Sequence, residues 1–143
     1  MSMTADLAEA RVELNSRCDA IEECYEYMLA YAGQGLASEP GEGAASQIRD
    51  YLKKCDEALT GLAQFITSFV GRLGVESMAP YAAFMTVIER DAKDAQAAVG
   101  LVLAQPSISS QLVDNLNASI HLRALLTDLF LIDEVLKSHR RAD

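Results

Sequence analysis

Three cysteines and one histidine are the residues of this 143-residue chain whose side chains could do chemistry together. Cys18, Cys24 and Cys55 offer thiolates and His121 offers an imidazole, which are ligands that zinc and Cu(I) prefer. If the chain folds back on itself near residues 33–43, Cys24 and Cys55 lie within about 3 Å of the same level along the helix axis. The same arithmetic places His121 within about one helical turn of Cys18. One interpretation is therefore a metal-binding or redox-sensing cluster of all four residues, with zinc or copper as the metal.

The other interpretation of these cysteines is structural packing. Cys18 and Cys55 fall on apolar stripes of two predicted helices, and cysteine is commonly buried as a small hydrophobic residue. The axes of packed helices lie about 8–10 Å apart, which is usually too far for a disulfide between two such stripes. We favour packing, which requires no cofactor.

Local motifs of common metal-dependent and phosphotransfer proteins are missing around the two histidines. Di-iron helical bundles need Glu-x-x-His pairs, but Ala118 and Leu136 stand three residues before His121 and His139. His121 is also not followed by the basic residue and the glycine found after the phosphorylated histidine of histidine phosphotransfer domains. Glycine-rich phosphate loops, Gly-x-Ser-x-Gly and His-Glu-x-x-His do not occur. We therefore expect a protein that is not an enzyme.

Composition and charge narrow the classes of partner. The chain carries 21 acidic and 12 basic residues, for a net charge of −9, so its field repels nucleic acids and anionic lipids. The start of the sequence lacks the pattern of a secretory signal, and no apolar run is long enough to span a membrane. An odd number of cysteines without a framework spacing agrees with a reducing compartment. We expect a cytoplasmic protein that forms one domain over residues 1–143.

The elements that would position these residues are helices, because apolar residues recur at alternate spacings of three and four. The clearest stripe is Ile48, Leu52, Cys55, Leu59, Leu62, Ile66, Phe69 and Leu73. Helices are predicted at about 4–32, 44–73, 79–104 and 108–139. Short connections after the second and third helices predict an antiparallel up-down-up-down four-helix bundle, and the glycine-containing connection 33–43 is expected to be mobile.

The last predicted helix changes its apolar face part of the way along. Its early apolar residues and those from Leu122 onward centre on nearly opposite sides at 100° per residue. Either the helix is kinked or split near residues 115–119, or it is straight and apolar on two sides. The second case predicts a homodimer or another protein partner, with interface residues Leu122, Leu126, Leu129, Phe130 and Leu131. Such a bundle would act as an adaptor, a regulator or an export-type chaperone that binds amphipathic helices.

Overall fold

The computed structural model describes residues 3–40 and 42–142, and within these two stretches it contains six helices and no strand. The helices are α1 (Met3–Gly33), α2 (Glu42–Leu59), α3 (Leu62–Leu73), α4 (Ala79–Leu103), α5 (Ser110–Ala118) and α6 (His121–Ala142). The prediction of an all-helical chain is confirmed. The predicted helices 44–73 and 108–139, in contrast, are each two helices in the structure.

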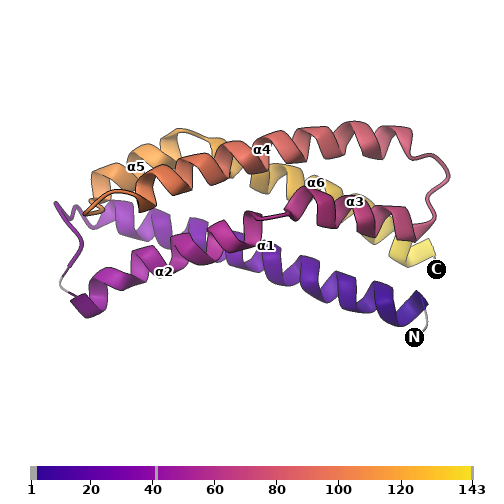
Figure 1. The fold of residues 1–143 in the computed structure, drawn as a ribbon, viewed down its shortest axis with the longest axis horizontal. Helices are drawn as coiled ribbons and strands as arrows, with labels where there is room; N and C mark the ends of the chain where they lie inside the picture. Colours follow the sequence, from indigo (N-terminus) through magenta and orange to yellow (C-terminus); the bar gives the residue numbers. More distant parts are fainter. Residues whose placement is uncertain (1–2, 41, 143) are drawn as a thin grey trace.

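The two long helices α1 and α4 have nearly the predicted bounds and form the frame of the molecule. Figure 1 shows α1 running along most of its length, with α2 and α3 following each other end to end. α4 returns along the opposite side, and α5 and α6 complete the structure. Both α1 and α4 contact each of the four shorter helices, so every short helix packs on both long ones.

The break between α2 and α3 is a correction to the predicted continuous helix 44–73. Gly61 has a φ of +69°, a left-handed conformation that ends the first helix and that glycine adopts without steric cost. Breaking a helix leaves carbonyl groups without partners. The guanidinium of Arg17 on α1 donates to two carbonyl oxygens at this break, at 2.7 and 3.1 Å. Gln96 on α4 donates to the Thr60 hydroxyl at 2.9 Å, so α1 and α4 together hold the break.

The last predicted helix is split rather than straight. α5 ends at Ala118, and Ile120 has a φ of +65° before α6 begins at His121. A β-branched residue rarely adopts this conformation. The split gives α6 an orientation independent of that of α5, and α6 turns its main apolar stripe into the core.

Buried apolar side chains from all six helices form one connected core. The stripe predicted in the second helical segment is fully buried from Ile48 to Phe69, even though the helix breaks inside it. Leu59 and Leu62 lie on either side of the break and are both buried. Burial of the stripe is therefore continuous where the helix is not.

The connection after α1, which was expected to be mobile, forms hydrogen bonds with the start of α5. Ser110, at the start of α5, exchanges two hydrogen bonds with the backbone of Leu36, at 2.8 and 2.9 Å. Its hydroxyl also donates to the Tyr31 carbonyl at 2.6 Å, and the Tyr31 hydroxyl donates to the Ile108 carbonyl at 2.6 Å. These bonds join the end of α1 to the connection before α5.

Candidate functional site

The thiols of Cys24 on α1 and Cys55 on α2 meet in the core. Both residues are fully buried, and their side chains are hydrogen bonded to each other. This hydrogen bond and burial raise the pKa of the Cys24 thiol. Since the thiolate is the form that binds metals and reacts with oxidants, the site favours two unreactive thiols.

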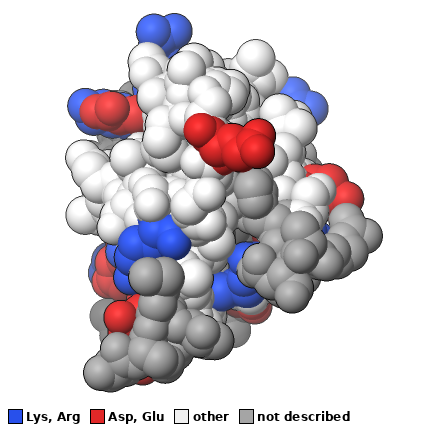
Figure 2. Space-filling model, turned by 90° about the vertical axis from the view of Figure 1, so that its right-hand side faces the viewer, with Lys and Arg blue, Asp and Glu red and all other residues white. Residues whose placement is uncertain are grey.

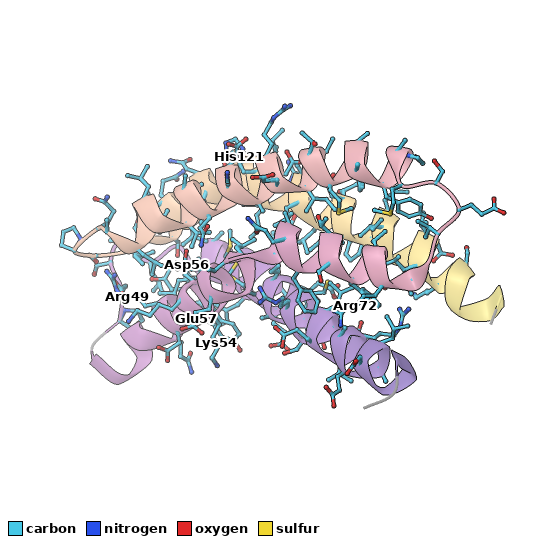
Figure 3. All side chains as sticks on the ribbon, turned by 45° about the vertical axis from the view of Figure 1, so that its right-hand side comes forward. Arg49, Lys54, Asp56, Glu57, Arg72 and His121 are labelled. Atoms are coloured by element: carbon cyan, nitrogen blue, oxygen red, sulfur yellow. The ribbon has the colours of Figure 1, made fainter. Side chains whose placement is uncertain are left out.

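Cys18 and His121 lie apart from that pair. Burial, followed by the charges of Asp133, Glu22 and Asp19, raises the pKa of the Cys18 thiol to about 12. His121 is the first residue of α6 and its side chain is exposed. Figure 3 shows it at the upper edge of the molecule.

The predicted four-residue metal cluster is therefore not assembled. Among the residues that the structure describes, no group of three or more His, Cys, Asp or Glu side chains could hold a metal ion. The arithmetic that brought His121 toward Cys18 assumed one continuous last helix. The break at Ile120 removes that assumption, and of the four predicted ligands Cys24 and Cys55 are the pair in contact.

The predicted interface residues separate into two groups. Leu122, Leu126 and Leu129 belong to the core of the chain itself, which corrects their assignment to a surface. Phe130 and Leu131 point outward, and each is 55% exposed. The split at Ile120 is the physical reason, because it lets α6 rotate its leucine stripe inward.

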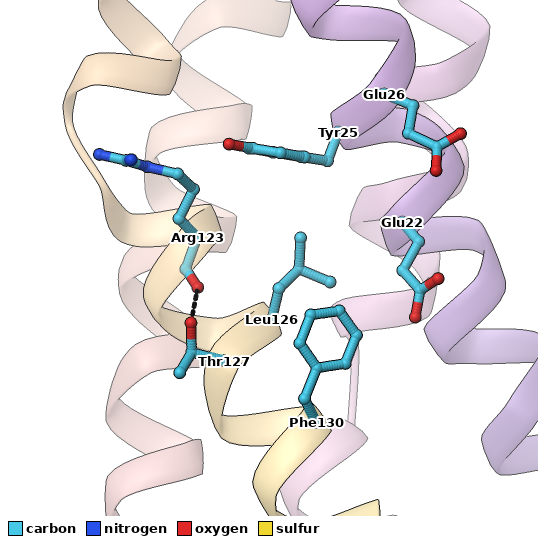
Figure 4. A pocket seen from close by; sticks show the side chains of 7 residues that line it. All are labelled: Glu22, Tyr25, Glu26, Arg123, Leu126, Thr127 and Phe130. Carbon is cyan, nitrogen blue, oxygen red and sulfur yellow. Dashed lines mark hydrogen bonds between the residues drawn. The ribbon is translucent and has the colours of Figure 1, made fainter.

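A hollow of about 290 Å³ lies between α1 and α6, and we call it the α1–α6 groove. Its lining residues are Glu22, Tyr25, Glu26, Arg123, Leu126, Thr127 and Phe130. Figure 4 shows Tyr25, Leu126 and Phe130 in the middle, with Glu22 and Glu26 on one flank and Arg123 on the other. The groove thus has an apolar floor and an acidic flank supplied by α1.

Carboxylates gather along this flank. Burial raises the pKa of Glu22, and the charges of Asp19, Glu26 and Asp133 raise it further. Three of these four carboxylates come from successive turns of α1, whereas Asp133 comes from α6. The neighbouring negative charges disfavour the ionised form of Glu22, and a cation beside the flank would stabilise that form.

A second hollow of about 280 Å³ lies between α4 and α6, and we call it the α4–α6 groove. It is lined by Pro80, Tyr81, Phe84, Leu131, Ile132 and Val135, none of which is charged. The run 77–88, which contains the start of α4, also has no charged residue. Figure 2 shows this end of the molecule, where charged side chains are scattered among a broad uncharged area.

Sequence reasoning found Phe130 and Leu131 but missed the residues across each groove from them. Glu22 and Glu26 have the appearance of an ordinary solvated face in the sequence. Tyr81 and Phe84 look like core residues of α4, although the uncharged run 77–88 was a signal that this surface differs.

No described helix has both the length and the apolar composition needed to cross a membrane. Comparisons of the chain with protein-family models, with curated proteins and with solved structures found no match.

Proposed function

We propose that this chain is a non-enzymatic interaction protein of the cytoplasm, acting as an adaptor, a regulator or an export-type chaperone. The observation that supports this proposal is the outward pair Phe130 and Leu131, which lie beside two separate grooves on α6. In this proposal, α2–α3 and α5–α6 each act as one broken segment of an up-down-up-down four-helix bundle. The bundle is the scaffold, and α6 with its two neighbouring helices is the binding surface.

We further propose that two copies associate across the α4–α6 groove. Each copy has a net charge of −9, so two copies repel each other except where charges are sparse. The α4–α6 groove is lined by uncharged residues alone, and Leu131 is half exposed at its edge. Burying the exposed half of such a side chain contributes about 1 kcal/mol in each copy.

Sedimentation velocity over about 1 to 100 μM protein tests the dimer, because a self-associating chain changes its apparent mass with concentration. We expect a dimer for the wild type and a folded monomer for Leu131→Glu. Leu101→Glu is the matched control, since Leu101 is 67% exposed on α4 and does not line either groove.

The two variants separate the specific interface from a general effect of added charge. If both variants remain dimeric, or both become monomeric, the α4–α6 groove is not the interface. A wild-type monomer at every concentration, with no change in apparent mass, would contradict the homodimer.

A further inference from the structure

The α1–α6 groove differs from the α4–α6 groove in charge, and this difference determines what can occupy it. The floor is formed by Tyr25, Leu126 and Phe130, and Figure 4 shows their side chains between the two helices. Phe130 is half exposed, so an apolar ligand would remove the remaining surface from water. An apolar floor of this kind suits the apolar face of a helix.

The acidic flank has few counter-charges, and Arg123, the cationic side chain that lines the groove, lies on the opposite flank (Figure 4). Asp133 pairs with Lys137 on the same helix, at 3.2 Å. Within the described part of the chain, no ion pair is formed by Asp19, Glu22 or Glu26. The carboxylates of this flank therefore repel one another in the free protein, and cationic side chains of a ligand would relieve that repulsion.

We propose that the α1–α6 groove binds a cationic amphipathic helix of a partner protein, with its apolar side chains on Tyr25 and Phe130 and its lysines or arginines toward Glu22 and Glu26. This inference rests on the proposed function as an interaction protein and names the chemistry of its partner. A second copy of this chain is disfavoured here, because its net charge of −9 would meet the acidic flank.

The dimensions of the groove set the length of the ligand. On α6 the lining runs from Arg123 to Phe130, which is about two helical turns or roughly 10 Å. A ligand helix that lies along it presents anchors at positions i, i+3 or i+4, and i+7. Two to three turns of the partner helix thus make the contact.

The probe is a synthetic peptide of about 18 residues made of leucine and lysine at helical spacing, with one tryptophan on its apolar face. The chain itself has no tryptophan, so the peptide's emission reports only the peptide. Transfer of the tryptophan into the groove shifts its emission to shorter wavelength, and titration gives a Kd. The comparison peptide replaces every lysine by glutamate, and a third peptide keeps the composition but scrambles the spacing.

Variants of the protein locate the binding site. Glu22→Gln with Glu26→Gln removes two charges from the flank, and Phe130→Ala removes the exposed part of the floor. The control is Asp50→Asn with Glu57→Gln, which removes the same charge from exposed positions of α2, a helix that does not line the groove. At about 150 mM salt we expect the flank variant to weaken lysine-peptide binding roughly tenfold and the control less than about threefold.

Four results would overturn the inference. Equal weakening by the flank variant and the α2 control would show non-specific attraction to an acidic protein. Equal binding of the glutamate peptide or the scrambled peptide would show that charge or spacing is not recognised. If Phe130→Ala converted a dimer to a monomer, this would show that a second copy covers the groove. If the peptide does not bind but the wild type is a dimer that Leu131→Glu disrupts, this inference alone is overturned. If the wild type is a monomer but binds the peptide, the homodimer alone is contradicted.

Discussion

The guanidinium of Arg49 forms a two-pronged ion pair with the carboxylate of Glu39, with its Nη2 2.7 Å from Oε1 and its Nε 2.9 Å from Oε2. Arg49 also donates to the carbonyl groups of Leu103 and Gln105, at 3.0 and 2.7 Å. Glu39 Oε1 accepts a hydrogen bond from the Ile108 amide at 2.9 Å. The pair thereby joins the α1–α2 connection and α2 to the end of α4 and the connection that follows it.

Replacing Arg49 by methionine should lower the free energy of unfolding by about 2–4 kcal/mol, because Glu39 would keep its charge without a partner. The side chain of Glu39 is only 9% exposed. The double variant Arg49→Met with Glu39→Gln should recover part of the loss. Urea denaturation of the single and double variants measures both effects.

The control for this prediction is the surface pair Lys93 and Glu89, whose side chains are 72% and 48% exposed. Lys93→Met should change the free energy of unfolding by less than about 0.5 kcal/mol. If Arg49→Met changes the free energy of unfolding as little as Lys93→Met does, the ion pair does not stabilise this end of the molecule.

The stability of the protein should depend on pH through Asp128 on α6, which faces Asp91 on α4. Burial, followed by a hydrogen bond to Asp91 and its charge, raises the pKa of Asp128 to about 7. Its Oδ2 atom is buried without a hydrogen-bond partner in the described part of the structure. The folded chain therefore binds a proton more tightly than the unfolded chain, whose aspartates titrate near 3.9.

Because the folded state holds the extra proton, the free energy of unfolding should be highest below about pH 4 for this group and fall as the pH rises to about 7. Asp128→Asn should flatten this dependence and raise the melting temperature at about pH 8. Asp94→Asn, an exposed position on α4, serves as the control and should leave the slope unchanged. Parallel pH profiles for the wild type and Asp128→Asn would contradict the assignment.

Much of the core could be predicted from the sequence, since spacing records burial directly. The stripe from Ile48 to Phe69 is buried as predicted, but the break at Gly61 inside it was missed. Leu59 and Leu62 keep the three-residue spacing of a helix across that break, so the pattern gave no sign of it. The glycine was the available signal, because a lone glycine within a helical pattern can mark an end.

The hydrogen bonds and ion pairs between distant segments could not be predicted from the spacing of apolar residues. Arg49 meets Glu39 and the carbonyl of Gln105 only when two connections far apart in the sequence come together. The candidate binding surface was predicted in part: Phe130 and Leu131 are outward, but the orientation of α6 depends on the conformation of Ile120. An isoleucine with positive φ has no local sequence signal, because other residues adopt that conformation far more readily.

The thiols of the native protein should react slowly with an alkylating reagent at about pH 7.5, since only the thiolate is reactive. Cys24 and Cys55 are fully buried, and the pKa of Cys18 is raised to about 12. In denaturant all three should react rapidly. Mass spectrometry of the alkylated peptides gives the rate at each position.

Burial is the larger cause of the raised pKa at Cys18, and Asp133→Asn tests the contribution of charge. Removing this charge should lower the pKa of the thiol and increase its rate of alkylation in the native protein. The same change should leave Cys24 unaffected. Rapid native alkylation of Cys24 or Cys55 would show that the α1–α2 contact opens readily and that the paired thiols are accessible.

Ile120 has the backbone conformation that separates α5 from α6. At this position we expect a glycine variant to be more stable than an alanine variant, the reverse of the usual order in a helix. With a φ of +65° and a side chain that is 54% exposed, Ile120 bears a steric cost of about 1–2 kcal/mol from its Cβ atom. Ile120→Gly removes the Cβ atom, whereas Ile120→Ala keeps it. We therefore expect the glycine variant to be more stable than the alanine variant by about 1 kcal/mol.

Gly71 provides the control, because it lies inside α3 without a positive φ and has open space where a Cβ atom would be. There the ordinary order should hold, and Gly71→Ala should raise the free energy of unfolding by about 0.5–1 kcal/mol. Ile120→Pro forces a negative φ and removes the amide that donates to Asn117 at 3.2 Å, so it should cost about 3 kcal/mol or more. Because glycine keeps the break and with it the rotation of α6, Ile120→Gly should sediment as the wild type does. If alanine proves more stable than glycine at position 120, this residue does not adopt the left-handed conformation, and the outward orientation of Phe130 and Leu131 must have another cause.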